Sequence, residues 1–333
     1  MILKRLITAF AATFAVLACT PDIDNGNESY NWDEEDKDQQ EEVVAPEVET
    51  EEGGGQTGNV PQPGWFEVPV VNASRSSEGW IVDNKDSDLY YAFHKSNVGT
   101  RNYSVCYNGA YHCPVWIAAP RHQMYRGNSG RTNAYNWDPD IPKSVQQAAT
   151  SGSTSGYNRG HMLGSNERTA STLTNNQVFY ITNIAPQGNP WFNQSRGGWN
   201  ILEGFVDGFE CSDTLYVVIG TYFEDYTDAY GNSATRKTAL FMQSDVQIPT
   251  MFYYALMRTK SGNSGKSLKD CERDEIMCAA FVRAHTNSIQ GQAVTKTEMM
   301  TIDALEELTG FDFFPSVPNA TEDSFTPSDW GLK

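Results

Sequence analysis

The sequence predicts an α+β fold with a mixed, largely antiparallel central sheet flanked by helices. The chain has 333 residues, of which 39% are hydrophobic and 12% aromatic, so it can bury a substantial core. Runs rich in β-branched and aromatic residues predict several strands. These runs mix with helical segments without the regular strand–helix alternation of a parallel α/β sheet, which favours the α+β class.

The expected elements follow from local residue patterns. Five runs rich in β-branched or aromatic residues are expected strands: 114–119, 178–182, 215–219, 251–257 and 279–284. Two segments, 199–209 and 299–308, carry apolar residues at three- and four-residue spacings and are expected helices. Gly310 follows the second helix and is expected to cap its C-terminus.

Residues 1–19 have the pattern of an export signal. Lys4 and Arg5 precede an apolar run over 6–18, which is too short for a stable membrane span. The end of this run, Val16-Leu17-Ala18-Cys19, resembles the lipobox of bacterial lipoproteins, which implies a lipid anchor on Cys19. A cleaved signal without lipid is the alternative. The protein is therefore expected to be exported, either periplasmic or attached to the outer membrane or cell surface.

Residues 20–63 are expected to form a disordered acidic tether, and residues 64–333 one folded domain. Between 20 and 60 there are fourteen acidic residues and a single basic one, Lys37, a net charge of −13. Such like-charge repulsion and low apolar content favour an extended, solvated spacer. Since the whole chain carries −18, the part from Pro61 onward is only moderately acidic, at −7.

Five cysteines follow Cys19, and an exported protein meets an oxidising compartment. Cys106 with Cys113, and Cys271 with Cys278, are close enough in sequence to close small loops, but spacing alone does not determine connectivity. Cys211 is then the odd cysteine, expected to be buried and free. Because no C-x-x-C pair occurs, a structural zinc site is not expected.

The residues that indicate chemistry lie between 157 and 203. Asn158-Arg159-Gly160-His161 comes first. Asn183-Ile184-Ala185-Pro186-Gln187 follows, and then come Asn193, Trp199 and Glu203. A histidine has its pKa near neutral pH and suits proton transfer, whereas amide and carboxylate oxygens suit a hard divalent cation.

This ordered set resembles the signature of the DNA/RNA non-specific endonuclease family, whose active site is a ββα-metal motif. The resemblance extends over roughly residues 115–315 and includes the C-terminal Thr309-Gly310-Phe311-Asp312-Phe313-Phe314-Pro315. It implies an α+β domain that hydrolyses phosphodiester bonds of DNA, RNA or both, without strong sequence preference, and leaves 5′-phosphates.

The resemblance also implies a role for each residue. His161 is expected to be the general base that removes a proton from the attacking water. Asn193 is expected to be the direct protein ligand of a divalent metal, Mg²⁺ or alternatively Mn²⁺, and Glu203 to hold metal-bound waters. The metal would stabilise the phosphate and the leaving oxygen.

Arginine and asparagine side chains complete the expected site. Arg159 and Arg131 are expected to bind the phosphate through fixed positive charge, with Arg121 and Arg126 as competing candidates for the place of Arg131. Two asparagines, Asn158 and Asn183, are expected at the substrate. Asn183 and Gln187 are further expected to brace the site through hydrogen bonds.

Two features depart from the family pattern. Asn158 stands where the family most often has Asp, which removes a negative charge near the metal waters. Asn193 and Glu203 are ten residues apart, somewhat more than is usual in the family. Gly197-Gly198 between them is expected to form a local loop, with the helix beginning after it.

Net acidity argues against tight binding of a polyanion, because nucleic-acid binders usually present basic patches. A local positive groove is expected from six arginines: Arg121, Arg126, Arg131, Arg159, Arg168 and Arg196. Two alternatives stay open. One is a surface lipoprotein that binds nucleic acid or another polyanion on an inactive nuclease scaffold. The other is a phosphodiesterase with a substrate other than a polynucleotide.

Overall fold

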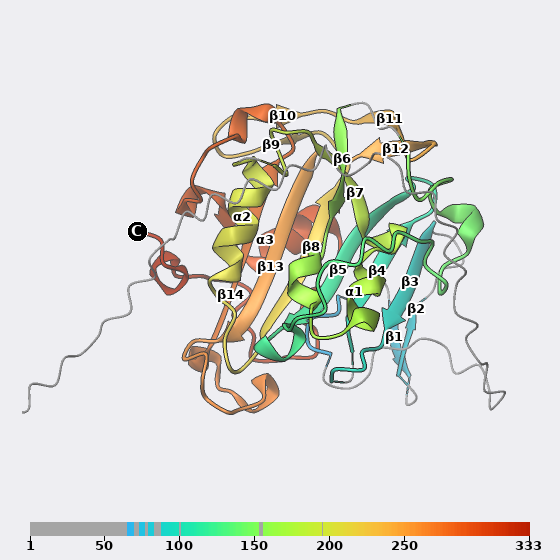
Figure 1. Ribbon diagram of the computed structural model, residues 1–333. Coiled ribbons are helices and arrows are strands. Elements are labelled where there is room, and N and C mark those ends of the chain that lie inside the picture. Colours follow the sequence, from blue (N-terminus) through green and yellow to red (C-terminus); the bar gives the residue numbers. More distant parts are fainter. Residues whose placement is uncertain are drawn as a thin grey trace, which may run out of the picture. The chain divides into compact units, whose positions relative to one another are not determined.

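A seven-stranded sheet dominates the computed structural model (Figure 1). The structure describes residues 65–69, 73–76, 79–82, 88–99, 101–152, 156–194 and 196–333, all within the unit Glu52–Lys333. The order of the strands across the sheet is β15-β14-β13-β8-β5-β4-β3. Their bounds are β3 Leu89–His94, β4 Tyr103–Asn108, β5 Cys113–Arg121, β8 Leu215–Tyr222, β13 Met251–Thr259, β14 Ile276–Ala284 and β15 Met299–Met300.

Every neighbouring pair in this sheet is antiparallel. The three central strands β5, β8 and β13 consist almost wholly of buried residues, because helices and loops cover both of their faces. Four of the five expected strands fall within β5, β8, β13 and β14. The expected fold class, α+β with a largely antiparallel sheet, is confirmed.

Helix α2 (Gly198–Asp207) covers one face of the sheet (Figure 1). Its Trp199 is fully buried and stacks on Tyr254 of β13, with ring centroids 4.8 Å apart and an interplanar angle of 5°. Tyr253, the preceding residue of β13, points to the opposite face and contacts Phe313, which follows helix α3 (Ile302–Thr309). The alternation along β13 thus ties the two helices to opposite sides of one sheet.

Shorter elements surround the sheet. Helix α1 spans Thr172–Val178. The two-stranded antiparallel pairs are β1 Ala73–Ser76 with β2 Gly79–Val82, β6 Tyr157–His161 with β7 Ile184–Gly188, β9 Tyr226–Thr227 with β10 Ser233–Ala234, and β11 Lys237–Phe241 with β12 Ser244–Ile248. The short 3-10 helices are Gln123–Tyr125, Lys143–Val145, Ser165–Arg168, Ile181–Asn183, Leu268–Asp270, Arg273–Glu275, Asn287–Ile289, Lys296–Glu298 and Pro327–Trp330.

One expected strand is wrong. Residues 178–182 contain the end of α1 and the start of a 3-10 helix, because Ser171 caps α1 by accepting a hydrogen bond from the Thr174 backbone N–H. Val178, Phe179 and Ile181 are all buried, so the run is apolar without being extended. A short buried apolar run does not by itself distinguish a strand from a helix end.

The C-terminal helix begins three residues later than expected. Met299 and Met300 pair with Phe281 and Ala280 as strand β15. Thr301 then caps the helix by accepting a hydrogen bond from the Ala304 backbone N–H. At the other end Gly310 has a φ of 76°, which confirms the expected C-terminal cap.

All five cysteines in the described residues are free thiols. The two loop closures considered from spacing are therefore not formed. The strand register explains why Cys106 and Cys113 are not joined: Cys106 lies opposite Trp116, and Cys113 lies opposite Asn108. Cys211 is free, as expected, but only half-buried.

The expected export signal, lipid-bearing Cys19 and acidic tether all lie outside the described residues. Within the described ranges, no helix is long and apolar enough to cross a membrane.

Candidate active site

The antiparallel strand pair β6–β7 positions His161, the expected general base. The two strands are antiparallel, with His161 opposite Ile184 and Gly160 opposite Ala185. Alternation along β6 places Arg159 and His161, two residues apart, on the same side of the strand. Strands β6 and β7 and the following helix α2 form the β-β-α succession that the family resemblance implies. They lie on the face of the sheet that α2 covers (Figure 1).

Gly160 is required by a close approach of Gln187. A Cβ atom at Gly160 would lie 2.1 Å from a carbon of the Gln187 side chain, which packs directly over the backbone there. The same side chain donates a hydrogen bond to the His161 backbone oxygen at 3.3 Å. Gln187 therefore braces the backbone of His161, as expected.

The imidazole of His161 lies in an apolar, positively charged setting. Its ring meets Phe179 edge-on at 4.7 Å and Tyr135 at 5.8 Å. The residue is half-exposed overall, but its Nε2 atom is buried and has no hydrogen-bond partner among the described residues. Burial lowers the pKa of His161 well below its ordinary value, and the charges of Arg131 and Arg159 lower it further. The ring is therefore neutral at neutral pH.

The structure brings both expected phosphate-binding arginines to His161. The Arg159 guanidinium lies over the Tyr135 ring, 4.1 Å from its centroid. The Arg131 guanidinium lies 4.8 Å from the Phe179 centroid. Partial desolvation of its guanidinium group lowers the pKa of Arg131, although the residue as a whole is exposed, and the nearby Arg159 charge lowers it further. Two cations held this close to each other favour an anionic ligand between them.

Tyr135 is the residue that sequence reasoning missed. Its hydroxyl accepts a hydrogen bond from Arg131 at 3.4 Å, its ring lies under Arg159, and its ring centroid is 5.8 Å from that of His161. It therefore contacts all three expected functional side chains. The only sequence signal is its place four residues after Arg131, in a loop whose path is determined by tertiary contacts.

Arg121 and Arg126, the two alternatives to Arg131, bind carboxylates of the protein itself. Arg121 is buried and donates hydrogen bonds to Glu167 and Asp207. Arg126 forms an ion pair with Glu210 at 2.9 Å.

The expected six-arginine groove is therefore wrong in part. Arg168 is completely buried, and it donates hydrogen bonds to Asn102 and to the Pro120 backbone oxygen. Arg121 and Arg168 cannot line a surface, because each is enclosed by its own partners. Of the six, Arg131 and Arg196 are exposed, while Arg126 and Arg159 are half-buried.

Asn193 lies in the turn before α2, close to β6. Its neighbour Phe192 is buried between Trp199 and Phe252, which fixes the chain at this point. The Asn158 side chain on β6 donates a hydrogen bond from Nδ2 to Oδ1 of Asn193 at 2.8 Å. The two asparagines expected at the metal and the substrate are thus in direct contact.

Glu203 projects from α2 among other carboxylates. Burial raises its pKa to about 8, with Glu167 and Asp207 contributing and Arg121 opposing the shift. Helix α2 begins at Gly198, with Gly197 as its N-cap, so Asn193 precedes the helix and Glu203 lies on it. The turn before α2 accommodates the longer spacing between the two residues, and the helix begins at Gly198, one residue earlier than expected.

Asn183 has a structural position. It is completely buried, its Oδ1 accepts from the Leu163 backbone N–H, and its Nδ2 donates to the backbone oxygens of Leu163 and Val178. It therefore braces the segment that follows His161. Its burial contradicts the expected contact with substrate.

A second group of potential metal ligands consists of His94, Asp138 and Asp140, whose ligand atoms lie within 4.8 Å of one another. His94 Nε2 is 3.0 Å from Asp138 and its Nδ1 is 3.4 Å from Asp140. Burial opposes the charge of His94, but the two carboxylates outweigh it and raise its pKa to about 9. A protonated ring with both nitrogens engaged is an ion-paired structural group and a poor metal ligand.

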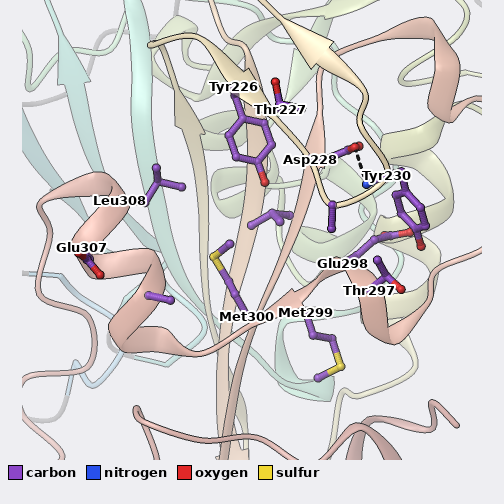
Figure 2. A pocket seen from close by; sticks show the side chains of 13 residues that line it. Tyr226, Thr227, Asp228, Tyr230, Thr297, Glu298, Met299, Met300, Glu307 and Leu308 are labelled. Atoms are coloured by element: carbon purple, nitrogen blue, oxygen red, sulfur yellow. Dashed lines mark hydrogen bonds between the residues drawn. The ribbon is translucent and has the colours of Figure 1, made fainter.

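One hollow among the described residues lies apart from these side chains. It measures about 550 Å³ and is lined by residues that include Tyr226, Met300 and Leu308 (Figure 2). None of the expected site residues belongs to its lining. The site around His161 is therefore separate from this hollow.

The β-β-α succession carries a neutral histidine, paired arginines and oxygen donors, the side-chain types that a metal-assisted hydrolase requires. A sequence profile described as DNA/RNA non-specific endonuclease matches residues 85–320. The chain belongs to this family, as the sequence analysis expected.

Known relatives agree with this assignment. Nuclease C1 of Cunninghamella echinulata var. echinulata is 32% identical over 128 residues, which cover 38% of this chain and 49% of that protein. A Nostoc nuclease is 26% identical over 65% of this chain and 73% of its own length. Human mitochondrial endonuclease G is 27% identical over 65% of this chain and 68% of its own length.

The fold also matches a solved structure. A chain in the crystal structure of the EndoG/EndoGI complex superposes with a TM-score of 0.52 at 20% identity, over 70% of this chain and 92% of that one. At this identity the likeness concerns the fold alone.

Proposed function

We propose that this protein is a divalent-metal-dependent endonuclease that cleaves DNA, RNA or both without strong sequence preference. One observation carries the proposal: the neutral His161 ring has a buried Nε2 without a hydrogen-bond partner in the described chain, beside two arginines. A neutral imidazole can accept a proton, and adjacent guanidinium groups attract the phosphate that is to be attacked. Family membership supplies the reaction class.

His161 is the general base in this mechanism. It takes the proton of a water that attacks phosphorus, and the resulting imidazolium returns the proton to solvent. Arg131 and Arg159 bind the non-bridging phosphate oxygens and stabilise the charge that accumulates on them. The bond from phosphorus to the 3′ oxygen breaks, that oxygen takes a proton from solvent water to become a 3′-hydroxyl, and the other product carries a 5′-phosphate.

Two of the expected site residues carry donors that fit a hard divalent ion. Asn193 would offer an amide oxygen directly, and Glu203, once deprotonated, would act through water; Mg²⁺ and Mn²⁺ accept both donor types. When bound, such an ion stabilises the phosphate and the leaving oxygen. Asn158, paired with Asn193, lies next to this position.

Substrate binding should be modest and sensitive to salt. The chain from Pro61 onward carries −7, so attraction to a polyanion depends on local positive charge such as that of Arg131 and Arg159. Interactions of this kind weaken as salt screens them. Export and a lipid on Cys19 would place the reaction in the periplasm or at the cell surface.

Digestion of plasmid DNA and of RNA tests the proposal. The chain from residue 64 onward, with Mg²⁺ or Mn²⁺, should cleave at least one polymer, and EDTA should stop cleavage. Cleavage that persists in EDTA, or none with any divalent ion, would refute it.

The main alternative is a catalytically inactive scaffold that binds nucleic acid or another polyanion. The observation in its favour is that the Asn158 amide occupies the oxygen of Asn193. Binding of DNA or RNA without turnover would support it. Turnover of small phosphodiesters but not of polynucleotides would instead point to a different substrate class.

A further inference from the structure

The contact between Asn158 and Asn193 bears directly on the expected metal ligand. Asn158 Nδ2 donates to Asn193 Oδ1 at 2.8 Å, and this is the atom expected to bind the cation. One lone-pair direction of that oxygen is therefore used by an N–H group. The same N–H group brings a partial positive charge next to the position where a cation would bind.

A pair of amides can form this contact in two directions. In the second direction both amides have turned over, so that Asn193 Nδ2 donates to Asn158 Oδ1 and the Asn193 oxygen faces away from Asn158. Both arrangements preserve the hydrogen bond, because each amide carries a donor and an acceptor. Only the second leaves the Asn193 oxygen fully available to a cation.

A carboxylate at position 158 would allow one direction only. It has no donor when ionised, so it would accept from Asn193 Nδ2 and hold the Asn193 oxygen outward permanently. Asn158 lacks this restriction. It allows an arrangement that competes with metal binding.

We propose that Asn158 is a positioning residue that sets the affinity for the divalent cation by selecting between two orientations of the Asn193 amide. The inference rests on the proposed function, since it takes Asn193 as the ligand. Cation binding shifts the pair to the orientation in which Asn193 donates, and part of the binding free energy is spent on that shift. The protein therefore loads its metal weakly, and loading depends on this amide pair.

Direct measurement of Mn²⁺ binding by electron paramagnetic resonance tests the inference without using activity. Asn158→Asp should tighten Mn²⁺ binding by about tenfold, a typical effect of a residue that orients a metal ligand. Asn193→Ala should weaken binding by at least as much. Asn200→Asp is the matched control: it adds the same charge at an exposed position of α2 and should change affinity little.

Side-chain amide signals in nuclear magnetic resonance provide the second measurement. Addition of Mg²⁺ to the wild-type protein should shift the Asn158 and Asn193 NH₂ signals together, because the donor of the pair changes. In Asn158→Asp the Asn193 signal should already lie at its metal-bound position without Mg²⁺.

The outcomes separate the inference from the function beneath it. If Asn193→Ala leaves Mn²⁺ affinity unchanged, the proposed metal ligand is wrong. If Asn193→Ala weakens binding while Asn158→Asp leaves it unchanged or weaker, the ligand stands and the inference is overturned. An equal gain in Asn158→Asp and Asn200→Asp would also overturn it, since charge alone would then explain the effect.

Discussion

Two histidines pack against adjacent residues of the chain, yet their surroundings give them opposite charge states. The His161 ring meets Phe179 at 4.7 Å, and the His94 ring meets Tyr180 at 5.3 Å. Arginines face His161. Burial lowers the pKa of His161, and the positive charges of Arg131 and Arg159 lower it further. Aspartates face His94 and raise its pKa to about 9 in spite of burial.

The difference shows how neighbours assign a role to the same side chain. A base must be neutral and must have an available nitrogen, which His161 provides. His94 is protonated at neutral pH and has both nitrogens engaged by carboxylates, so it stabilises the fold as a cation. Burial opposes protonation of both rings, and the sign of the adjacent charges decides the outcome.

The largest expected effect comes from removing the base itself. His161→Ala should reduce kcat for plasmid cleavage by roughly 10²–10⁴-fold, the usual contribution of a general base. Circular dichroism should show an intact fold. His122→Ala, at a half-exposed histidine, is the matched control and should retain activity. Near-normal turnover in His161→Ala would contradict the assignment of His161 as the general base.

The second prediction tests whether the charge of Arg131 lowers the pKa of His161. Arg131→Gln should lower kcat/KM by about 10²-fold through lost phosphate stabilisation. It should also move the acid limb of the pH–rate profile to higher pH, because a positive charge that opposes protonation of His161 has gone. Arg126→Gln, which breaks the ion pair with Glu210, should leave that limb in place. An unchanged limb in Arg131→Gln would contradict the electrostatic argument.

The third prediction concerns stability around His94. Because the folded pKa is raised to about 9 from an ordinary 6.5, the stabilisation is complete below pH 6.5 and is lost as pH rises through 9. This amounts to about 3 kcal/mol in the free energy of unfolding. Urea unfolding of the wild type and of His94→Gln should therefore show a difference that shrinks between pH 6 and pH 10. A constant difference would mean that His94 is not charged.

The smallest effect is expected for Tyr135→Phe. The ring under Arg159 remains, and only the hydroxyl that accepts from Arg131 at 3.4 Å is lost. A long hydrogen bond contributes little, so kcat/KM should fall by a few-fold. Tyr135→Ala, which also removes the ring, should cost more. Equal effects of the two substitutions would assign the role to the hydroxyl alone.

Local patterns in the sequence were sufficient for much of the fold. The expected strands that became β5, β8, β13 and β14 were recognisable because their buried side chains are continuous along the chain. Residues 178–182 were misassigned because burial at a helix end produces the same apolar run as a strand. The cap at Ser171 that determines the helix is a single hydroxyl, a weak signal in isolation.

The site residues that are close to one another in sequence were predictable. Those whose positions depend on tertiary contacts were less so. His161, Arg159 and Asn193 follow from one motif, whereas Tyr135 reaches them only through the path of its loop. Arginine is usually exposed, which is why Arg168 was expected at the surface. Its burial depends on acceptors from distant segments, Asn102 and Pro120, which no local pattern indicates.

The distribution of thiols gives this fold a practical advantage for spectroscopy. Cys106, Cys113, Cys271 and Cys278 are buried, whereas Cys211 is half-exposed. In a protein that starts at residue 64, a maleimide dye should therefore react first at Cys211, without any cysteine being removed. Because these thiols are not joined in disulfides, the protein can be treated with a reductant, which is removed before labelling, without changing its covalent structure. A fluorophore there would mark one known position of the fold.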